Sequence, residues 1–102
     1  MDKKIDTTRK QRLRGQILAL CKELQHFGAG IALLHKIVSK DNVPCTESDI
    51  KDACYYLHGK GLIEFKHMES QSLNMAMDIA YITAAGIDVL EGTALVEGIY
   101  CR

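Results

Sequence analysis

The sequence predicts an α+β fold that is mostly helical, and three observations support this prediction. Apolar residues recur at helical spacing in three segments, at about 7–26, 31–40 and 47–60. Two shorter segments, 62–67 and 75–82, resemble strands and are joined by a polar run. Apolar residues make up 47% of the chain, which is enough for a packed core and excludes a disordered protein.

The first helix is expected to begin at Thr7 or Thr8, either of which can cap it, and to end near His26. Residues 1–6 are expected to be a flexible basic N-terminus. The helix ends before Gly28-Ala29-Gly30, because two glycines in three residues disfavour its continuation. One apolar stripe follows the helix at Leu13, Ile17, Leu20, Cys21 and Leu24.

The third helix has the clearest local signals. Thr46 and Asp49 are placed to satisfy the open N–H groups at its start, and Gly61 suits a left-handed position after its end. The second helix, 31–40, is separated from it by turn-forming residues that include the only proline, Pro44.

The two strands are expected to form a hairpin. Ile63 and Phe65 share one face of the first strand, whereas Glu64 and Lys66 face the other way. Met77, Ile79 and Tyr81 share one face of the second strand. This alternation fits a two-stranded sheet that helices cover on one side, with a longer loop at 68–74. A short third strand near 28–31 or 44–45 is left open.

A short fourth helix, capped by Thr83, is expected to end at Gly92. The order of helix, strand, polar loop, strand and helix is the C-terminal layout of a winged helix-turn-helix domain, in which the two-stranded β-hairpin is the wing. The sequence thus divides into a flexible N-terminus (1–6), a winged-helix domain (7–92) and a C-terminal tail (93–102).

The helical stripes and the hairpin are expected to share one core, because none of them is stable alone. The predicted core residues are Leu13, Ile17, Leu20, Cys21, Leu24, Leu34, Ile37, Val38, Ile50, Ala53, Leu57, Leu62, Ile63, Ile79, Tyr81, Ile82, Ile87 and Leu90.

Nothing in the sequence indicates an enzyme, a metal or a cofactor. The chain has no glycine-rich phosphate loop and no nucleophile with an oriented base. Four cysteines, at 21, 45, 54 and 101, lack any Cys-x-x-Cys pair, so buried free thiols are the preferred interpretation. Cys54 and His58 share a helix face, but no further ligands are spaced to complete a site.

Charge is unevenly distributed although the formal net charge is zero. Residues 1–22 hold seven basic and two acidic residues, a net of +5, and the rest of the chain has a net of −5. Such an arm either holds phosphates or packs on the acidic body of a partner subunit. No apolar run is long enough to span a bilayer and no signal peptide precedes the first helix, so we expect a cytoplasmic protein.

A winged helix often presents the helix before its hairpin to the DNA major groove. The candidate DNA-binding residues are Ser48, Lys51 and Tyr55 on the third helix, Lys66 and His67 in the hairpin, and Arg9, Lys10, Arg12 and Arg14 in the arm. Three acidic residues disfavour DNA binding by this helix, namely Glu47, Asp49 and Asp52. They would repel phosphates at the end by which a recognition helix enters the DNA groove. The near-neutral pI of about 6.9 also favours a protein-interaction module over a DNA reader.

The C-terminal segment 82–92, Ile-Thr-Ala-Ala-Gly-Ile-Asp-Val-Leu-Glu-Gly, resembles a family of small winged-helix proteins of Mu-like bacteriophages and prophages. Its members end in a similar Thr-x-x-Gly-x-Asp-Val-x-Glu-Gly segment with a Gly-Val pair soon after, matched here by Gly98-Ile99. The likeness would cover about 10–100, and only the last twenty residues match at motif level. The family's basic Arg-Pro ending has no counterpart in Tyr100-Cys101-Arg102.

The resemblance implies a phage or prophage setting, a bacterial host cell and a DNA-binding fold, and it supplies no catalytic residues. We therefore expect a transcription-regulator-like protein that binds double-stranded DNA; the alternative is a non-enzymatic protein-interaction or phage assembly module. We also expect a homodimer, because the long first helix and the apolar tail offer surfaces for pairing and two-fold dimers are the commonest oligomers.

Overall fold

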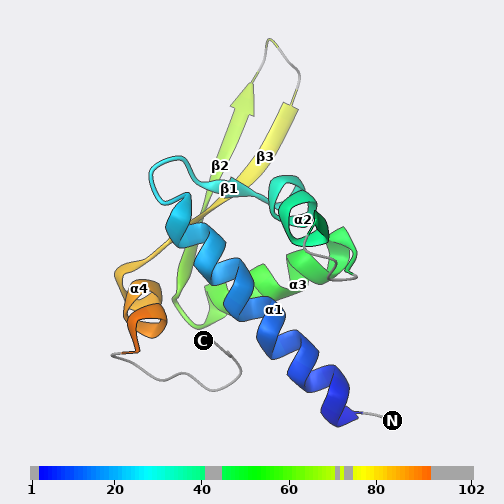
Figure 1. Ribbon diagram of the computed structural model, residues 1–102. Coiled ribbons are helices and arrows are strands. Elements are labelled where there is room, and N and C mark those ends of the chain that lie inside the picture. The colour runs from blue at the N-terminus through cyan, green and yellow to red at the C-terminus, as the bar shows by residue number, and fades with distance from the viewer. Residues whose placement is uncertain (1–2, 41–44, 71, 73–74, 93–102) are drawn as a thin grey trace.

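The computed structural model describes residues 3–40, 45–70, 72 and 75–92. It is a compact, mostly helical α+β structure (Figure 1). Its elements in chain order are α1 (Lys3–Glu23), β1 (Ala29–Gly30), α2 (Ile31–Lys40), α3 (Glu47–Gly59), β2 (Ile63–Ser70), β3 (Met75–Ile82) and α4 (Ala84–Glu91).

The strands form one antiparallel sheet in the order β1-β3-β2. The β2–β3 hairpin pairs without interruption from Ile63 opposite Ile82 to Ser70 opposite Met75. Residues Ala29 and Gly30 pair with Ala80 and Ile79, so the third strand lies at the first of the two places that the sequence left open. The helices gather at one end of the sheet, and the hairpin projects away from them (Figure 1).

The core lies where α1, α2 and α3 meet the base of the sheet. Of the predicted core residues, Leu20, Leu24, Ile37, Tyr81, Ile82, Ile87 and Leu90 are only half-buried, and the others are buried. Leu18, Ala29, Cys54, Ala80 and Val89 are buried as well, although they were absent from the predicted core. Leu18 is buried because a second element, α4, packs on α1 beside the predicted stripe.

The start of α1 was predicted incorrectly. The sequence placed a flexible segment at 1–6 and a helix start at Thr7 or Thr8, but the helix already begins at Lys3. Residues 3–6 contain no glycine or proline, so nothing in them opposes helix propagation. The helix ends at Glu23, three residues before the expected end, and Gly28 closes the following turn with a φ of 79°. Its N–H donates to the Leu24 carbonyl oxygen over 2.7 Å.

The other helix boundaries were predicted closely. The structure confirms the predicted bounds of α2, the Thr83 cap of α4 and the left-handed Gly61, whose φ is 76°. It also confirms that Thr46 and Asp49 cap α3 reciprocally. These features depend on residues close together in the chain, so local sequence patterns predict them.

The hairpin differs from the prediction in two respects. Strand β2 continues to Ser70, three residues beyond the predicted end, because the polar residues of the expected loop pair with β3. The register also places Lys66 opposite Ile79, and Phe65 opposite Ala80. Opposed residues share a face, so the apolar residues Ile63 and Phe65 lie on one side of the sheet and Ile79 on the other. The expectation of a sheet with a single covered side was therefore wrong.

Candidate nucleic-acid interface

The exposed face of α3 carries three of the predicted contact residues. Ser48, Lys51 and Tyr55 are all exposed, and 56% of Tyr55 is accessible to solvent. The opposite stripe of the helix, which includes Ile50 and Leu57, is fully buried. Helix α3 thus packs on the core through its apolar side and exposes to solvent the side that the sequence predicted.

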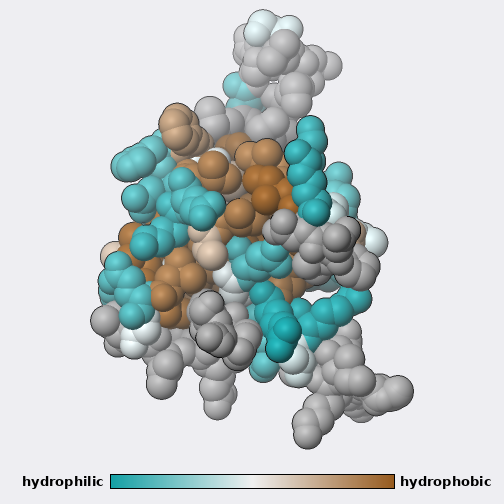
Figure 2. Space-filling model, viewed as in Figure 1, coloured by the Kyte–Doolittle hydropathy of each residue, from teal (hydrophilic) through white to brown (hydrophobic). Residues whose placement is uncertain are grey.

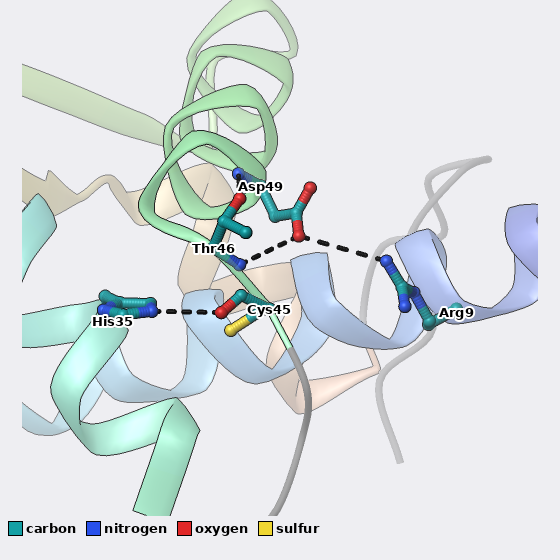
Figure 3. A network of polar contacts seen from close by, with 5 residues as sticks. All are labelled: Arg9, His35, Cys45, Thr46 and Asp49. Carbon is teal, nitrogen blue, oxygen red and sulfur yellow. Dashed lines mark hydrogen bonds and ion pairs between the residues drawn. The ribbon is translucent and has the colours of Figure 1, made fainter.

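The first turn of α3 is fixed by its capping box (Figure 3). The Asp49 N–H donates to Thr46 Oγ1 over 3.1 Å, and the Thr46 N–H donates to Asp49 Oδ2 over 2.9 Å. Just before this turn, the Nε2–H group of His35 in α2 donates a hydrogen bond to the Cys45 carbonyl oxygen over 3.0 Å. The His35 hydrogen bond and the Thr46–Asp49 capping box together fix where α3 begins relative to α2.

Helix α1 brings basic side chains to one flank of α3. The Arg9 guanidinium lies 3.9 Å from Asp49 Oδ2, and Figure 3 shows it pointing from α1 towards the start of α3. A small cavity of about 110 Å³ lies along this seam between the two helices. Its lining contains Arg9, Lys10, Arg14, Asp49 and Asp52, so basic groups from α1 lie beside both carboxylates. We call these five residues the basic flank.

Tyr56 of α3 provides a further contact for this flank. The Arg14 guanidinium carbon lies 3.6 Å from the centre of the Tyr56 ring, in a cation–π arrangement. Arg14 is consequently half-buried, whereas Arg9, Lys10 and Arg12 are exposed. The basic arm expected from the sequence is therefore a helix packed on α3 of its own chain.

Lys66 and His67, which the sequence had grouped as hairpin contacts to DNA, lie on opposite faces of the hairpin. Phe65 packs against Tyr55 of α3, with ring centroids 5.7 Å apart, and against His58 at 5.1 Å. His67 is on the same face of β2 as Phe65, and Lys66 is on the other face. The Lys66 ammonium instead lies 4.9 Å from the centre of the Tyr81 ring. Lys66 and His67 therefore do not form one phosphate-binding edge.

His67 lies between two carboxylates at the outer part of the hairpin. Its Nδ1 is 2.9 Å from Asp78 Oδ1 and its Nε2 is 3.2 Å from Glu69 Oε1. Both carboxylates accept hydrogen bonds, so only the protonated ring satisfies the two contacts at once. The hydrogen bond to Asp78, followed by that to Glu69, raises the pKa of His67 above its usual value of 6.5.

The hairpin-side flank of α3 is therefore acidic. Glu47, at the start of α3, and Asp78 border the same groove as Lys51, and Glu69 adds a third carboxylate through His67. We call Glu47, Glu69 and Asp78 the acidic flank. The sequence analysis did not identify Asp78 as a site residue, although Asp78 is the only charged residue in β3.

The cysteines that the structure describes are free, and Cys21 and Cys54 are buried. Burial raises the pKa of each thiol to about 12, so both remain neutral and unreactive at physiological pH. Cys101 lies outside the described residues. Within 3–40, 45–70, 72 and 75–92, no three His, Cys, Asp or Glu side chains are grouped closely enough to hold a metal ion.

No described helix is both long and apolar enough to cross a bilayer. A scan of protein-family models and a search of curated proteins found no match to this chain.

Proposed function

We propose that this chain is a winged helix-turn-helix protein that binds double-stranded DNA, as a transcription-regulator-like protein of phage or prophage origin. The order α1-β1-α2-α3-β2-β3-α4 with a three-stranded antiparallel sheet supports the winged-helix assignment. The resemblance of segment 82–92 supports the phage setting. Fold alone does not establish function, and the surface of α3 provides the support for DNA binding.

The basic flank is the observation that favours DNA. Arg9 and Lys10 lie beside the two acids, Asp49 and Asp52, that would otherwise repel phosphates at the start of α3. The Arg9–Asp49 pair is exposed, and such pairs contribute little to stability, so Arg9 can exchange a carboxylate for a phosphate. Ser48 is exposed on the same helix, within reach of a duplex that approaches from the α1 side. Lys51 borders the hairpin-side groove and Tyr55 packs against Phe65, so neither is part of this contact.

The hairpin does not contribute phosphate contacts in this proposal. Lys66 is on the face of the hairpin away from α3, and His67 is bonded to two carboxylates. DNA therefore approaches α3 from the α1 side. The sequence had suggested that Lys66 and His67 of the hairpin hold phosphates together with the arm.

A salt series on a labelled duplex of arbitrary sequence tests this proposal without knowledge of an operator. The logarithm of affinity should fall linearly with the logarithm of salt concentration, with a slope of about −0.9 per phosphate contacted. Lys10→Glu with Arg12→Glu should reduce this slope by about 2 in magnitude, because about 1 is lost per phosphate contact. Lys66→Glu is the matched control and should leave the slope unchanged.

The proposal fails if the wild-type chain binds no duplex at low salt, or if Lys66→Glu has the same effect as the double variant. Either result would favour the second candidate, a non-enzymatic protein-interaction or phage assembly module. The acidic flank is the observation that favours this second function, since its three carboxylates outnumber the neighbouring basic residues Lys51 and His67.

We also propose that the chain forms a homodimer. The first turns of α1 extend beyond the other helices in Figure 1 and leave helical surface for a partner subunit. Light scattering at micromolar concentration should give twice 11.4 kDa, and a strict monomer would contradict this proposal.

A further inference from the structure

An apolar groove of about 660 Å³ lies between the start of α2, the start of α3 and the hairpin. Its floor includes Gly30, Ile31 and Ile79, and Leu33 lies at its side with 43% of its surface exposed. Figure 2 shows apolar surface where β1, β3 and α2 meet, bordered by polar surface. The groove lies on the hairpin side of α3, away from the basic flank.

The sheet has an open edge beside this groove. Strand β1 contains only two residues and pairs with Ile79 and Ala80, whereas β3 extends back to Met75. After Gly30 the chain leaves the sheet and enters α2. Among the described residues, no strand lies on the β1 side of β3 before Ile79. Unpaired backbone groups at a strand edge readily pair with another extended chain.

The charged residues around the groove indicate which charge a bound segment should carry. Glu47 and Asp78 border the apolar floor, and Glu69 is adjacent through its hydrogen bond to His67. Lys51 is the one lysine in the lining. His67, which is protonated between Asp78 and Glu69, also lines the groove, so three carboxylates face two cations. This excess of one negative charge disfavours a nucleic acid and favours a Lys or Arg side chain. A second copy paired through the same edge would bring Asp78 towards Asp78, so like charges oppose self-pairing there.

We propose that this groove binds an extended segment of a partner protein that adds as a strand beside β3. Apolar side chains of that segment cover Ile79 and Leu33, and a Lys or Arg contacts Asp78. Main-chain hydrogen bonds provide affinity in this mode of recognition, and alternate side chains provide specificity. The site is separate from the proposed DNA contact, so a single α3 helix serves two partners on its two flanks.

Gly30 offers a way to fill the groove without disturbing the fold. A Cβ atom at this position would meet only Ile79 Cδ1, at 3.7 Å, which is an ordinary contact, and the backbone is not left-handed. Gly30→Phe therefore adds a large side chain at a residue that lines the groove. Gly28 is unsuitable for this purpose, because a Cβ there would collide with Ile79 and its φ is 79°.

The test is a selection of random twelve-residue peptides displayed on phage, with the purified full chain as the target. Enriched peptides should alternate apolar and other residues and contain Lys or Arg. Synthetic copies should bind the wild type, and binding should weaken at least tenfold with Gly30→Phe and with Asp78→Lys. Lys10→Glu with Arg12→Glu should leave peptide binding unchanged, which separates this site from the proposed DNA surface.

Several outcomes would overturn the proposal: no enrichment, acidic consensus peptides, or peptides that bind Gly30→Phe as tightly as the wild type. Two others assign the groove to a different occupant and overturn it equally. One is self-association that Gly30→Phe abolishes; the other is much tighter peptide binding by a chain that ends at Gly92. Circular dichroism checks that each variant is folded, and Leu33→Asp, at an exposed position, replaces Gly30→Phe if that variant unfolds.

Discussion

The two flanks of α3 carry opposite charge, although the chain as a whole is neutral. On the α1 side, Arg9, Lys10 and Arg14 surround two acids of α3. On the hairpin side, His67 is held between Asp78 and Glu69. Net charge therefore says little about what one face of this protein can bind, because the balance of basic and acidic residues differs between the two sides of a single helix.

Leu57 is one of the fully buried side chains that hold the helix between the two flanks. This side chain is fully buried between α3 and the rest of the core. Leu57→Ala should lower the free energy of unfolding by about 2–5 kcal/mol, because it removes buried methyl groups and leaves a cavity. Urea denaturation followed by circular dichroism measures this change. Leu33→Ala, at an exposed position of α2, should cost much less. Equal losses would mean that Leu57 is not a core residue.

Helix α4 packs against the base of the hairpin at Gly86. A Cβ atom at this position would lie 2.4 Å from the Leu62 carbonyl oxygen and 2.7 Å from Ile82 Cγ1. Gly86→Ala should therefore cost about 1–3 kcal/mol through overpacking, as measured by thermal or urea unfolding. Gly59→Ala is the matched control: nothing lies within 4 Å of its Cβ position, so that variant should be neutral or more stable. A stable Gly86→Ala protein would contradict this packing.

The sequence predicted those parts of the fold that depend on neighbouring residues. The limits of α3 and α4 were predicted correctly from the Thr46–Asp49 cap, Gly61 and Thr83. Each of these signals acts on backbone within four residues of itself. Apolar spacing likewise gave the buried stripe of α3. Burial of Leu18 could not be predicted in this way, since it depends on α4 packing from the far end of the chain.

The candidate site was predicted less well, for a similar reason. Exposure of Ser48, Lys51 and Tyr55 follows from helical periodicity alone. The separation of Lys66 from His67 follows from strand alternation, but which of them faces α3 depends on how Phe65 packs against Tyr55. The contact of Arg14 with Tyr56 depends on how α1 lies against α3, and no local pattern indicates that arrangement.

Both flanks share the first turn of α3, and the cap can be tested separately. Thr46→Ala removes the oxygen that accepts the Asp49 N–H and should cost about 1 kcal/mol of folding stability. Thr46→Ser keeps that hydroxyl and should restore most of the loss. Chemical denaturation of the three proteins measures both effects. If serine fails to restore stability, the methyl group rather than the hydrogen bond accounts for the loss.

The acidic flank should respond to pH through His67. Its pKa is raised in the folded protein, so its contribution to stability is fully present below about pH 6.5 and is lost as pH rises through the folded value. An NMR titration of the ring protons should give a pKa above 6.5, and Asp78→Asn should lower it. A pKa unaffected by Asp78→Asn would mean that the hydrogen bond to Asp78 does not form.

The segregation of two binding surfaces across α3 is the central claim, and amide chemical-shift mapping tests it most directly. A duplex of arbitrary sequence is added to the labelled protein at low salt. The expected shifts are confined to α1 near residues 9–14 and to the exposed face of α3 near Ser48. Shifts centred on Gly30, Asp78 and Ile79 would place DNA on the acidic flank and contradict the claim.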